Sequence, residues 1–251
     1  MVQSAKLAVI LVVLVLIQCT FVDGWWRRRY RRKYRTPVPT SSTYRCRNRR
    51  SIYEQEEQDS KTKTGIKGQG KSKRGLAEAI PIIELGLNVL TKVLDTLGNI
   101  ERKIAIGIGN DTPFAWKADG VYFRSGTSDD VLPACLSSKE AAVFPARKTS
   151  GPVATGAVGV LCYYIPDKKK SLCVLFSVPF DYNLYSNWWD VKVFSGKKSP
   201  NHQLYVDMYY GDPYKGDNRY HERNLGSGFK LVNGYMTSSG NAKLKMKITT
   251  K

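Results

Sequence analysis

The amino-acid sequence predicts a mainly β protein, an antiparallel β-sandwich flanked by two α-helices. Isoleucines alternate with small residues over 104–108, and apolar residues alternate with lysines over 243–248. A period of two is typical of strands with one buried face. Further apolar and aromatic runs, each ended by Gly, Pro, Asn or Asp, lie at 153–164, 172–180 and 191–194. Many short strands separated by turn residues favour a sandwich.

Residues 1–24 are typical of a secretory signal peptide. Lys6 provides a positive start, an apolar run follows over 7–17, and a cleavage site fits at 22–24. The apolar run is about half of the roughly 20 residues that a spanning helix needs, which disfavours a membrane anchor. No later segment has the length and apolar content of a conventional transmembrane helix, so we expect a secreted, water-soluble product.

A basic pro-segment and linker is predicted at 25–74. Residues 1–74 hold 18 Lys and Arg against 5 Asp and Glu, which is most of the net charge of +19. The stretch 27–50, with 11 basic residues and no acidic one, could bind nucleic acid or an anionic surface. An exported chain rarely meets nucleic acid, so we expect a disordered pro-segment and no nucleic-acid partner. This leader would keep the protein inactive or aid its export, and cleavage after 71–74 would leave Gly75 as the first mature residue.

An amphipathic helix is predicted at 75–100, ahead of a sandwich at 101–251. Apolar residues recur there at spacings of three and four, and they are Ile80, Ile83, Leu87, Leu90, Leu94 and Leu97. The opposite face carries Glu84, Asn88, Lys92 and Asp95. Pro81 is expected to bend the first turns or to lie near the helix start. About 25 helical residues extend roughly 38 Å, enough to cross a hydrocarbon core of about 30 Å.

This helix allows two interpretations. Most amphipathic helices pack their apolar face on a core, here the face of a sheet. Alternatively, several copies could turn apolar sides to lipid and polar sides to a hydrated lumen, where Glu84 and Asp95 would favour cations. Both hold if the helix is packed in the released protein and inserted at the membrane.

Three cysteines lie in the expected mature chain. Cys162 and Cys173 are placed symmetrically about a turn at 166–170, so they could face each other across a hairpin and form a disulfide. Two buried thiols are the alternative, and the pattern does not separate them. Cys135 would then have no partner.

Residues suited to enzyme chemistry are scarce. The two histidines, His202 and His221, belong to no metal-binding spacing or nucleophile arrangement and are expected at the surface or in hydrogen bonds. No glycine-rich loop joins a strand to a helix in the manner of phosphate-binding sites. We therefore expect no catalytic site, no metal and no cofactor.

Aromatic residues are concentrated at 182–210, and a second short helix is expected at 202–210. The cluster comprises Tyr182, Tyr185, Trp188, Trp189, Tyr205, Tyr209 and Tyr210. Tyr and Trp suit the headgroup level of a bilayer, and clustered aromatic faces attract quaternary ammonium groups such as choline. The alternative is an aromatic-rich core. Adjacent strand residues point to opposite faces, so we expect one of Trp188 and Trp189 in the core and the other exposed.

In these regions the chain resembles the actinoporins, the pore-forming cytolysins of sea anemones. The resemblance covers nearly all of 75–251. It is carried by the motifs YFRSGTSD at 122–129, GPVATGAVGV at 151–160, LFSVP at 175–179, DYN at 181–183 and YSNWW at 185–189. It implies a sandwich flanked by two helices, whose N-terminal helix detaches and inserts as the protein oligomerises.

The resemblance also implies a site for phosphocholine headgroups, with sphingomyelin as the preferred lipid. Carried over position by position, its residues are Ser125, Val158, Ser177, Pro179, Tyr185, Tyr205, Tyr209 and Tyr210, with Trp188 in an exposed aromatic patch and Arg102 near the membrane. Leu184 stands where the family usually has an exposed tryptophan, which predicts weaker initial membrane affinity. The three cysteines are additions to the family pattern.

A second class of function fits the same sandwich. Related folds bind sugars, so a lectin-like or lipid-binding protein could attach to membranes without perforating them. The full amphipathic stripe at 75–100 favours the first class. We therefore predict a cytolysin that binds phosphocholine membranes, self-associates and inserts its helices to form a cation-permeable pore.

Overall fold

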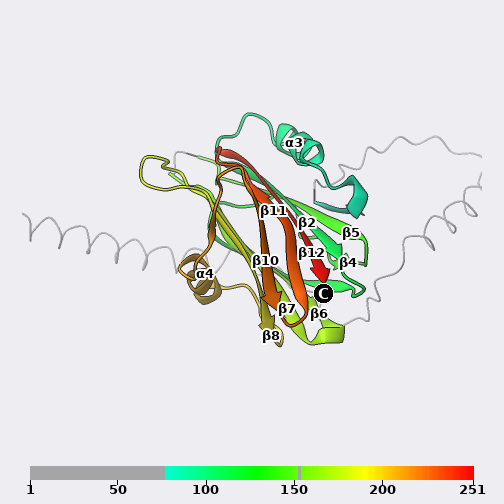
Figure 1. The fold of residues 1–251 in the computed structure, drawn as a ribbon. Coiled ribbons are helices and arrows are strands. Elements are labelled where there is room, and N and C mark those ends of the chain that lie inside the picture. Colours follow the sequence, from blue (N-terminus) through cyan, green and yellow to red (C-terminus); the bar gives the residue numbers. More distant parts are fainter. Residues whose placement is uncertain (1–76, 152–153) are drawn as a thin grey trace, which may run out of the picture. The chain divides into compact units, whose positions relative to one another are not determined.

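The computed structural model describes residues 77–151 and 154–251 (Figure 1). The predicted signal peptide, the pro-segment and linker, and Gly75 lie outside the described residues. The described chain forms two six-stranded sheets that pack face to face around one apolar core. The prediction of a β-sandwich flanked by two helices is therefore confirmed.

Each sheet is assembled from strands that are far apart in the sequence. The first sheet has the order β1 (Glu78–Pro81), β5 (Glu140–Arg147), β2 (Lys103–Asp111), β12 (Asn241–Thr250), β11 (Phe229–Met236) and β10 (Tyr220–Gly226). The second has the order β4 (Cys135–Leu136), β3 (Trp116–Ser125), β6 (Ala157–Ile165), β7 (Lys170–Val178), β8 (Trp188–Ser195) and β9 (Tyr214–Lys215). Neighbours are antiparallel except β2 and β12, which pair in parallel.

Alternate side chains of β2 and β12 face the core, as the period of two in the sequence predicted. Ile104, Ile106 and Ile108 of β2 lie in the core between the sheets, beside alternate apolar residues of β12. The small residues between the isoleucines face outward, where helix α3 (Leu87–Thr96) packs on β2, β5 and β12. Helix α4 (His202–Tyr209) packs on the outer face of the second sheet, against β3, β6, β7 and β8 (Figure 1).

The predicted helix over 75–100 is wrong in extent. Residues before α3 form strand β1 and the short 3₁₀ helix η1 (Ile82–Glu84), so the regular α-helix has 10 residues. At 1.5 Å per residue it extends about 15 Å. Ile83, predicted on the apolar stripe, is instead 91% exposed. None of the helices in the described part of the chain has the length and apolar content of a membrane span.

Two local features shorten this helix. Pro81 has no N–H to donate and disfavours helical geometry at Ile80, which instead pairs with Ala141 on the edge of β5. Gly86 is the extended N-cap of α3 and supplies no side-chain cap. Leu85 covers Gly107 of β2, where a Cβ atom would lie 2.5 Å from the Leu85 Cδ1 atom. A side chain at this position of β2 would displace the Leu85 methyl group, so glycine allows the segment to lie this close.

Buried Lys103 holds the C-terminal end of α3. Its Nζ atom donates hydrogen bonds to the carbonyls of Leu94 at 2.8 Å and Gly98 at 2.6 Å. The Leu94 carbonyl also accepts from the Leu97 N–H at 3.2 Å, and a cation at this end of the helix interacts favourably with the helix dipole. The end of α3 is thus fastened to the first residue of β2.

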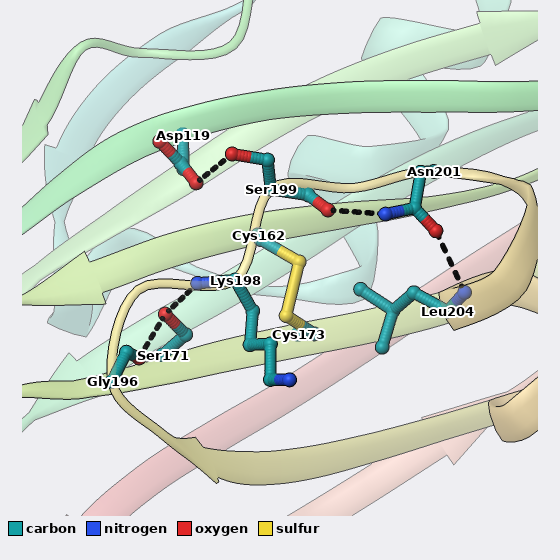
Figure 2. The surroundings of a disulfide bond; sticks show 9 residues. All are labelled: Asp119, Cys162, Ser171, Cys173, Gly196, Lys198, Ser199, Asn201 and Leu204. Carbon is teal, nitrogen blue, oxygen red and sulfur yellow. Dashed lines mark hydrogen bonds between the residues drawn. A yellow bond between two sulfur atoms is a disulfide. The ribbon is translucent and has the colours of Figure 1, made fainter.

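Cys162 and Cys173 form a disulfide between β6 and β7, at directly opposite positions of the two strands (Figure 2). The bond is buried beneath α4, in a cluster with Leu204 and Met208. The structure therefore contains the disulfide and not the alternative of two buried thiols. Cys135 is disulfide-bonded too, so the expectation that it has no partner is wrong.

Replacing the two cysteines of this hairpin by serine (C162S and C173S) should lower the free energy of unfolding by about 3 kcal/mol. The cross-link closes a loop of roughly a dozen residues and so restricts the unfolded chain. Urea unfolding of the oxidised wild type and the double variant measures the difference, with the Cys135 disulfide retained in both. Coincident unfolding curves would contradict this expectation.

Candidate membrane-binding site

Helix α4 presents a ladder of aromatic rings. His202 stacks on Tyr205 with 6.4 Å between ring centroids, Tyr205 stacks on Tyr209 at 5.4 Å, and Tyr210 meets Tyr209 edge-on at 5.2 Å. Spacings of three and four residues put the first three rings on one helix face. Asn201 begins the helix, because its Oδ1 atom accepts a hydrogen bond from the Leu204 N–H at 2.9 Å. The predicted short helix at 202–210 is confirmed.

The ladder continues onto β3 through a residue that the sequence analysis did not select. The Tyr122 hydroxyl lies 3.2 Å from the His202 Nδ1 atom. His202 is therefore a hydrogen-bonding residue, as expected, but it also forms part of the aromatic surface. The sequence signal for this role was that His202 lies three residues before Tyr205, a spacing that puts both rings on one helix face. Tyr122 begins the motif at 122–129, but no spacing linked it to His202, which is 80 residues away.

Burial favours the neutral phenol form of Tyr205 and Tyr209. Burial raises the pKa of Tyr205, and the neighbouring Tyr209 raises it further, while Arg124 opposes the shift. Burial also raises the pKa of Tyr209, with smaller contributions from Tyr210 and Tyr185. These rings are therefore uncharged and can attract a cation with their faces.

Four predicted residues form one row across the second sheet. Ser125 of β3 pairs with Val158 of β6, which pairs with Ser177 of β7, which pairs with Trp188 of β8. Directly paired residues share a face, and for this row it is the outer face on which α4 packs. Val158 and Ser177 are buried. Trp188 is half-buried on the outer face and Trp189 is fully buried in the core, as expected for neighbours on a strand.

The loop that follows β7 adds exposed apolar side chains. Pro179 continues the chain directly after β7, and Phe180, Leu184 and Tyr185 are exposed. The loop folds back on itself through a hydrogen bond from the Tyr185 N–H to the Asp181 carbonyl, at 3.1 Å. This loop therefore presents Tyr185 as an exposed ring between β7, which carries Ser177, and β8, which begins at Trp188.

Arg102 ties the segment after α3 to this loop. Its Nε atom donates to the Phe180 carbonyl at 2.8 Å, and its guanidinium lies 4.7 Å from the Tyr182 ring centroid. The Tyr182 hydroxyl in turn donates to the Asn187 side chain at 2.6 Å. Arg102 is therefore placed beside the aromatic loop, with its charge over a ring.

The predicted pore-lining residues lie apart from these aromatic groups. Asn88, Lys92 and Asp95 are exposed on the solvent face of α3, opposite the buried Leu90 and Leu94. Glu84 is exposed as well, but it belongs to η1 and not to the helix. The predicted stripe is therefore continuous only over the three residues that α3 contains.

One hollow of the described chain lies apart from the predicted site. An open, polar hollow of about 470 Å³ lies between residues 99–101 and 147–150, and it contains none of the predicted site residues. Over 77–151 and 154–251, no three His, Cys, Asp or Glu side chains are grouped so that they could hold a metal.

Comparison with known proteins identifies the family. The sequence model of the sea anemone cytotoxic protein family matches residues 76–250. DELTA-stichotoxin-Hcr4b of Radianthus crispa is 51% identical over 165 residues, which are 66% of this chain and 92% of that protein. Nigrelysin of Anthopleura nigrescens is 48% identical over 180 residues, or 70% of this chain and 83% of that protein.

A solved structure shares the fold at much lower identity. The lipid-binding protein Nakanori superposes with a TM-score of 0.54 at 13% identity, over 67% of this chain and 82% of that chain. The family match spans both sheets, both helices and every predicted site residue. The chain therefore belongs to the sea anemone cytotoxic protein family, the actinoporins, and is a cytolytic toxin and not an enzyme.

Proposed function

We propose that the toxin binds phosphocholine headgroups, preferentially those of sphingomyelin, and then oligomerises and inserts its N-terminal segments to form a cation-permeable pore. The observation that carries this proposal is the α4 ladder lying on the same sheet face as the row from Ser125 to Trp188. Each aromatic face that meets a quaternary ammonium group contributes about 0.5–2 kcal/mol. Several such contacts support selective adhesion to choline lipids.

Insertion needs a change of shape at the N-terminal segment. An α3 of about 15 Å is half the thickness of a hydrocarbon core of about 30 Å. We propose that residues 77–86 leave β5 and η1 and join α3 as one longer helix. Glu84, Asn88, Lys92 and Asp95 would then share one polar stripe facing the lumen. The Lys103 hydrogen bonds support a hinge at the other end, since they hold the C-terminal end of α3 in place.

The lectin-like or lipid-binding alternative has one observation in its favour. The N-terminal segment is strand-paired with β5 and packed on β2, and in this state α3 is too short to cross a hydrocarbon core. The two functions differ in outcome at the membrane. Binding to vesicles without release of their contents would select the alternative.

Vesicle leakage tests the proposal. We expect the mature protein to release dye from vesicles of phosphatidylcholine and sphingomyelin far faster than from vesicles of phosphatidylglycerol. Residues 75–251 hold 22 basic and 16 acidic residues, so a simple attraction to anionic lipid is modest. Equal or faster leakage from the phosphatidylglycerol vesicles would point to lysis driven by charge instead.

A further inference from the structure

One buried carboxylate lies where β8, β10 and the end of α4 meet. The Asp190 side chain is fully buried on β8 and forms ion pairs with Lys192 at 3.4 Å and with Arg223 at 3.1 Å. Lys192 is two residues along the same strand, so it shares a face with Asp190. Arg223 comes from β10 of the other sheet. Asp190 therefore holds together two cations that belong to different sheets.

Both cations bind the chain directly after α4. The Lys192 Nζ atom donates to the Gly211 carbonyl at 2.7 Å, and the Arg223 Nη2 atom donates to the Asp212 carbonyl at 3.3 Å. The fit at Gly211 is tight, because a Cβ atom there would lie 2.5 Å from the Lys192 Nζ atom and 2.4 Å from the Asp207 carbonyl oxygen. These two carbonyls immediately follow Tyr210.

Arg223 also fixes the far side of this connection. Its Nε atom donates to the Tyr214 hydroxyl at 2.9 Å, and its guanidinium lies 4.2 Å from the centre of that ring. Tyr214 in turn stacks on the buried Trp189, with 4.9 Å between ring centroids. The chain between α4 and β9 is therefore held at both ends by groups that contact Asp190 or the residue before it.

We propose that Asp190 is a positioning residue for the membrane site: it orients Lys192 and Arg223, and through them it sets the direction in which Tyr209 and Tyr210 project. This inference rests on the proposed binding of choline headgroups by those tyrosines. Asp190 itself does not touch the lipid, since its side chain is fully buried. A misplaced chain end would turn Tyr209 and Tyr210 away from the other rings of the ladder.

The electrostatics of the group agree with this role. Burial raises the pKa of Asp190, and Arg223 and Lys192 counter that effect only in part. A carboxyl group whose pKa is raised by folding favours the folded state more as the pH falls, so the ionised form does not contribute net stability. Buried ion pairs often contribute little net stability. Their role is then to fix the positions of the groups that they join.

Four substitutions test the inference. We expect D190N and K192M each to weaken binding to sphingomyelin and phosphatidylcholine vesicles about tenfold, which is close to the loss of one cation–π contact. K192R, which keeps a charged donor near Gly211, should bind within about twofold of wild type. The matched control is E222Q, which removes an exposed ion pair with Lys230 on neighbouring strand β11 and should leave binding unchanged.

Two further measurements separate positioning from folding. The unfolding free energy of D190N should be no lower than that of wild type. Dye release per bound molecule should also be unchanged, because the proposed defect lies in attachment and not in insertion.

If D190N still binds vesicles while the double variant Y209A with Y210A does not, the positioning role is overturned and the proposed function stays intact. Loss of folded structure in D190N, with K192M binding normally, would overturn it as well. A wild type that binds no choline vesicle would instead reject the proposed function itself.

Discussion

A disulfide joining positions 79 and 142 (A79C with A142C) should abolish pore formation while leaving membrane binding intact. Ala79 of β1 and Ala142 of β5 are directly opposite partners, the same relation that Cys162 and Cys173 have in their native disulfide. The cross-link would keep the N-terminal segment on the sheet. We expect dye release from sphingomyelin vesicles to fall at least about 100-fold, because no helix long enough to span can then form.

Reduction should restore leakage in the cross-linked variant. Wild type treated with the same reductant is the necessary control, since reduction also opens the Cys162–Cys173 bond, and A79C alone controls for the substitution. Vesicle co-sedimentation should show unchanged binding, because α3 and α4 lie on outer faces of different sheets. Leakage by the oxidised variant at the wild-type rate would mean that the N-terminal segment does not perforate the membrane.

Truncating Tyr209 and Tyr210 to alanine should remove binding at the first step. With each ring contributing about 0.5–2 kcal/mol to the attraction for choline, the pair should account for about 100-fold in affinity. Dye release should fall in parallel, because it requires bound protein. Co-sedimentation with sphingomyelin vesicles over a range of lipid concentrations measures the loss.

The matched control for this pair is Y220A. Tyr220 is an exposed tyrosine on β10 that packs on Tyr235, with 5.0 Å between ring centroids, away from the α4 ladder. Its removal tests whether any exposed tyrosine supports adhesion. Equal loss of binding in Y220A and in the double variant would contradict a specific site on α4.

Much of the fold follows from patterns that are local in the sequence. The period of two at 104–108 and 243–248 identified core strands, and the structure confirms both. The symmetric placement of Cys162 and Cys173 about a turn allowed their pairing, which the structure contains. These features depend on residues within about ten positions of one another, where spacing determines geometry directly.

The N-terminal helix shows the limit of such patterns. Spacings of three and four continue through 80–97, yet the chain is extended at Ile80 because the edge of β5, about 60 residues later, accepts it as a strand partner. Periodicity records which side chains share a face in a helix. It gives no information about a strand elsewhere in the chain that could pair with the same residues. Pro81 was the local residue that disfavoured a helix at Ile80.

The sequence by itself determined the sandwich, the short helix at α4 and the family, because each rests on local periodicity or on contiguous motifs. Only the tertiary structure decided where α3 begins, and it alone joined Tyr122 to His202 and Arg223 to Asp190, residues 80 and 33 positions apart. Contacts of that kind depend on how strands are ordered in the two sheets. That order is set by packing of the whole core, and no single segment encodes it.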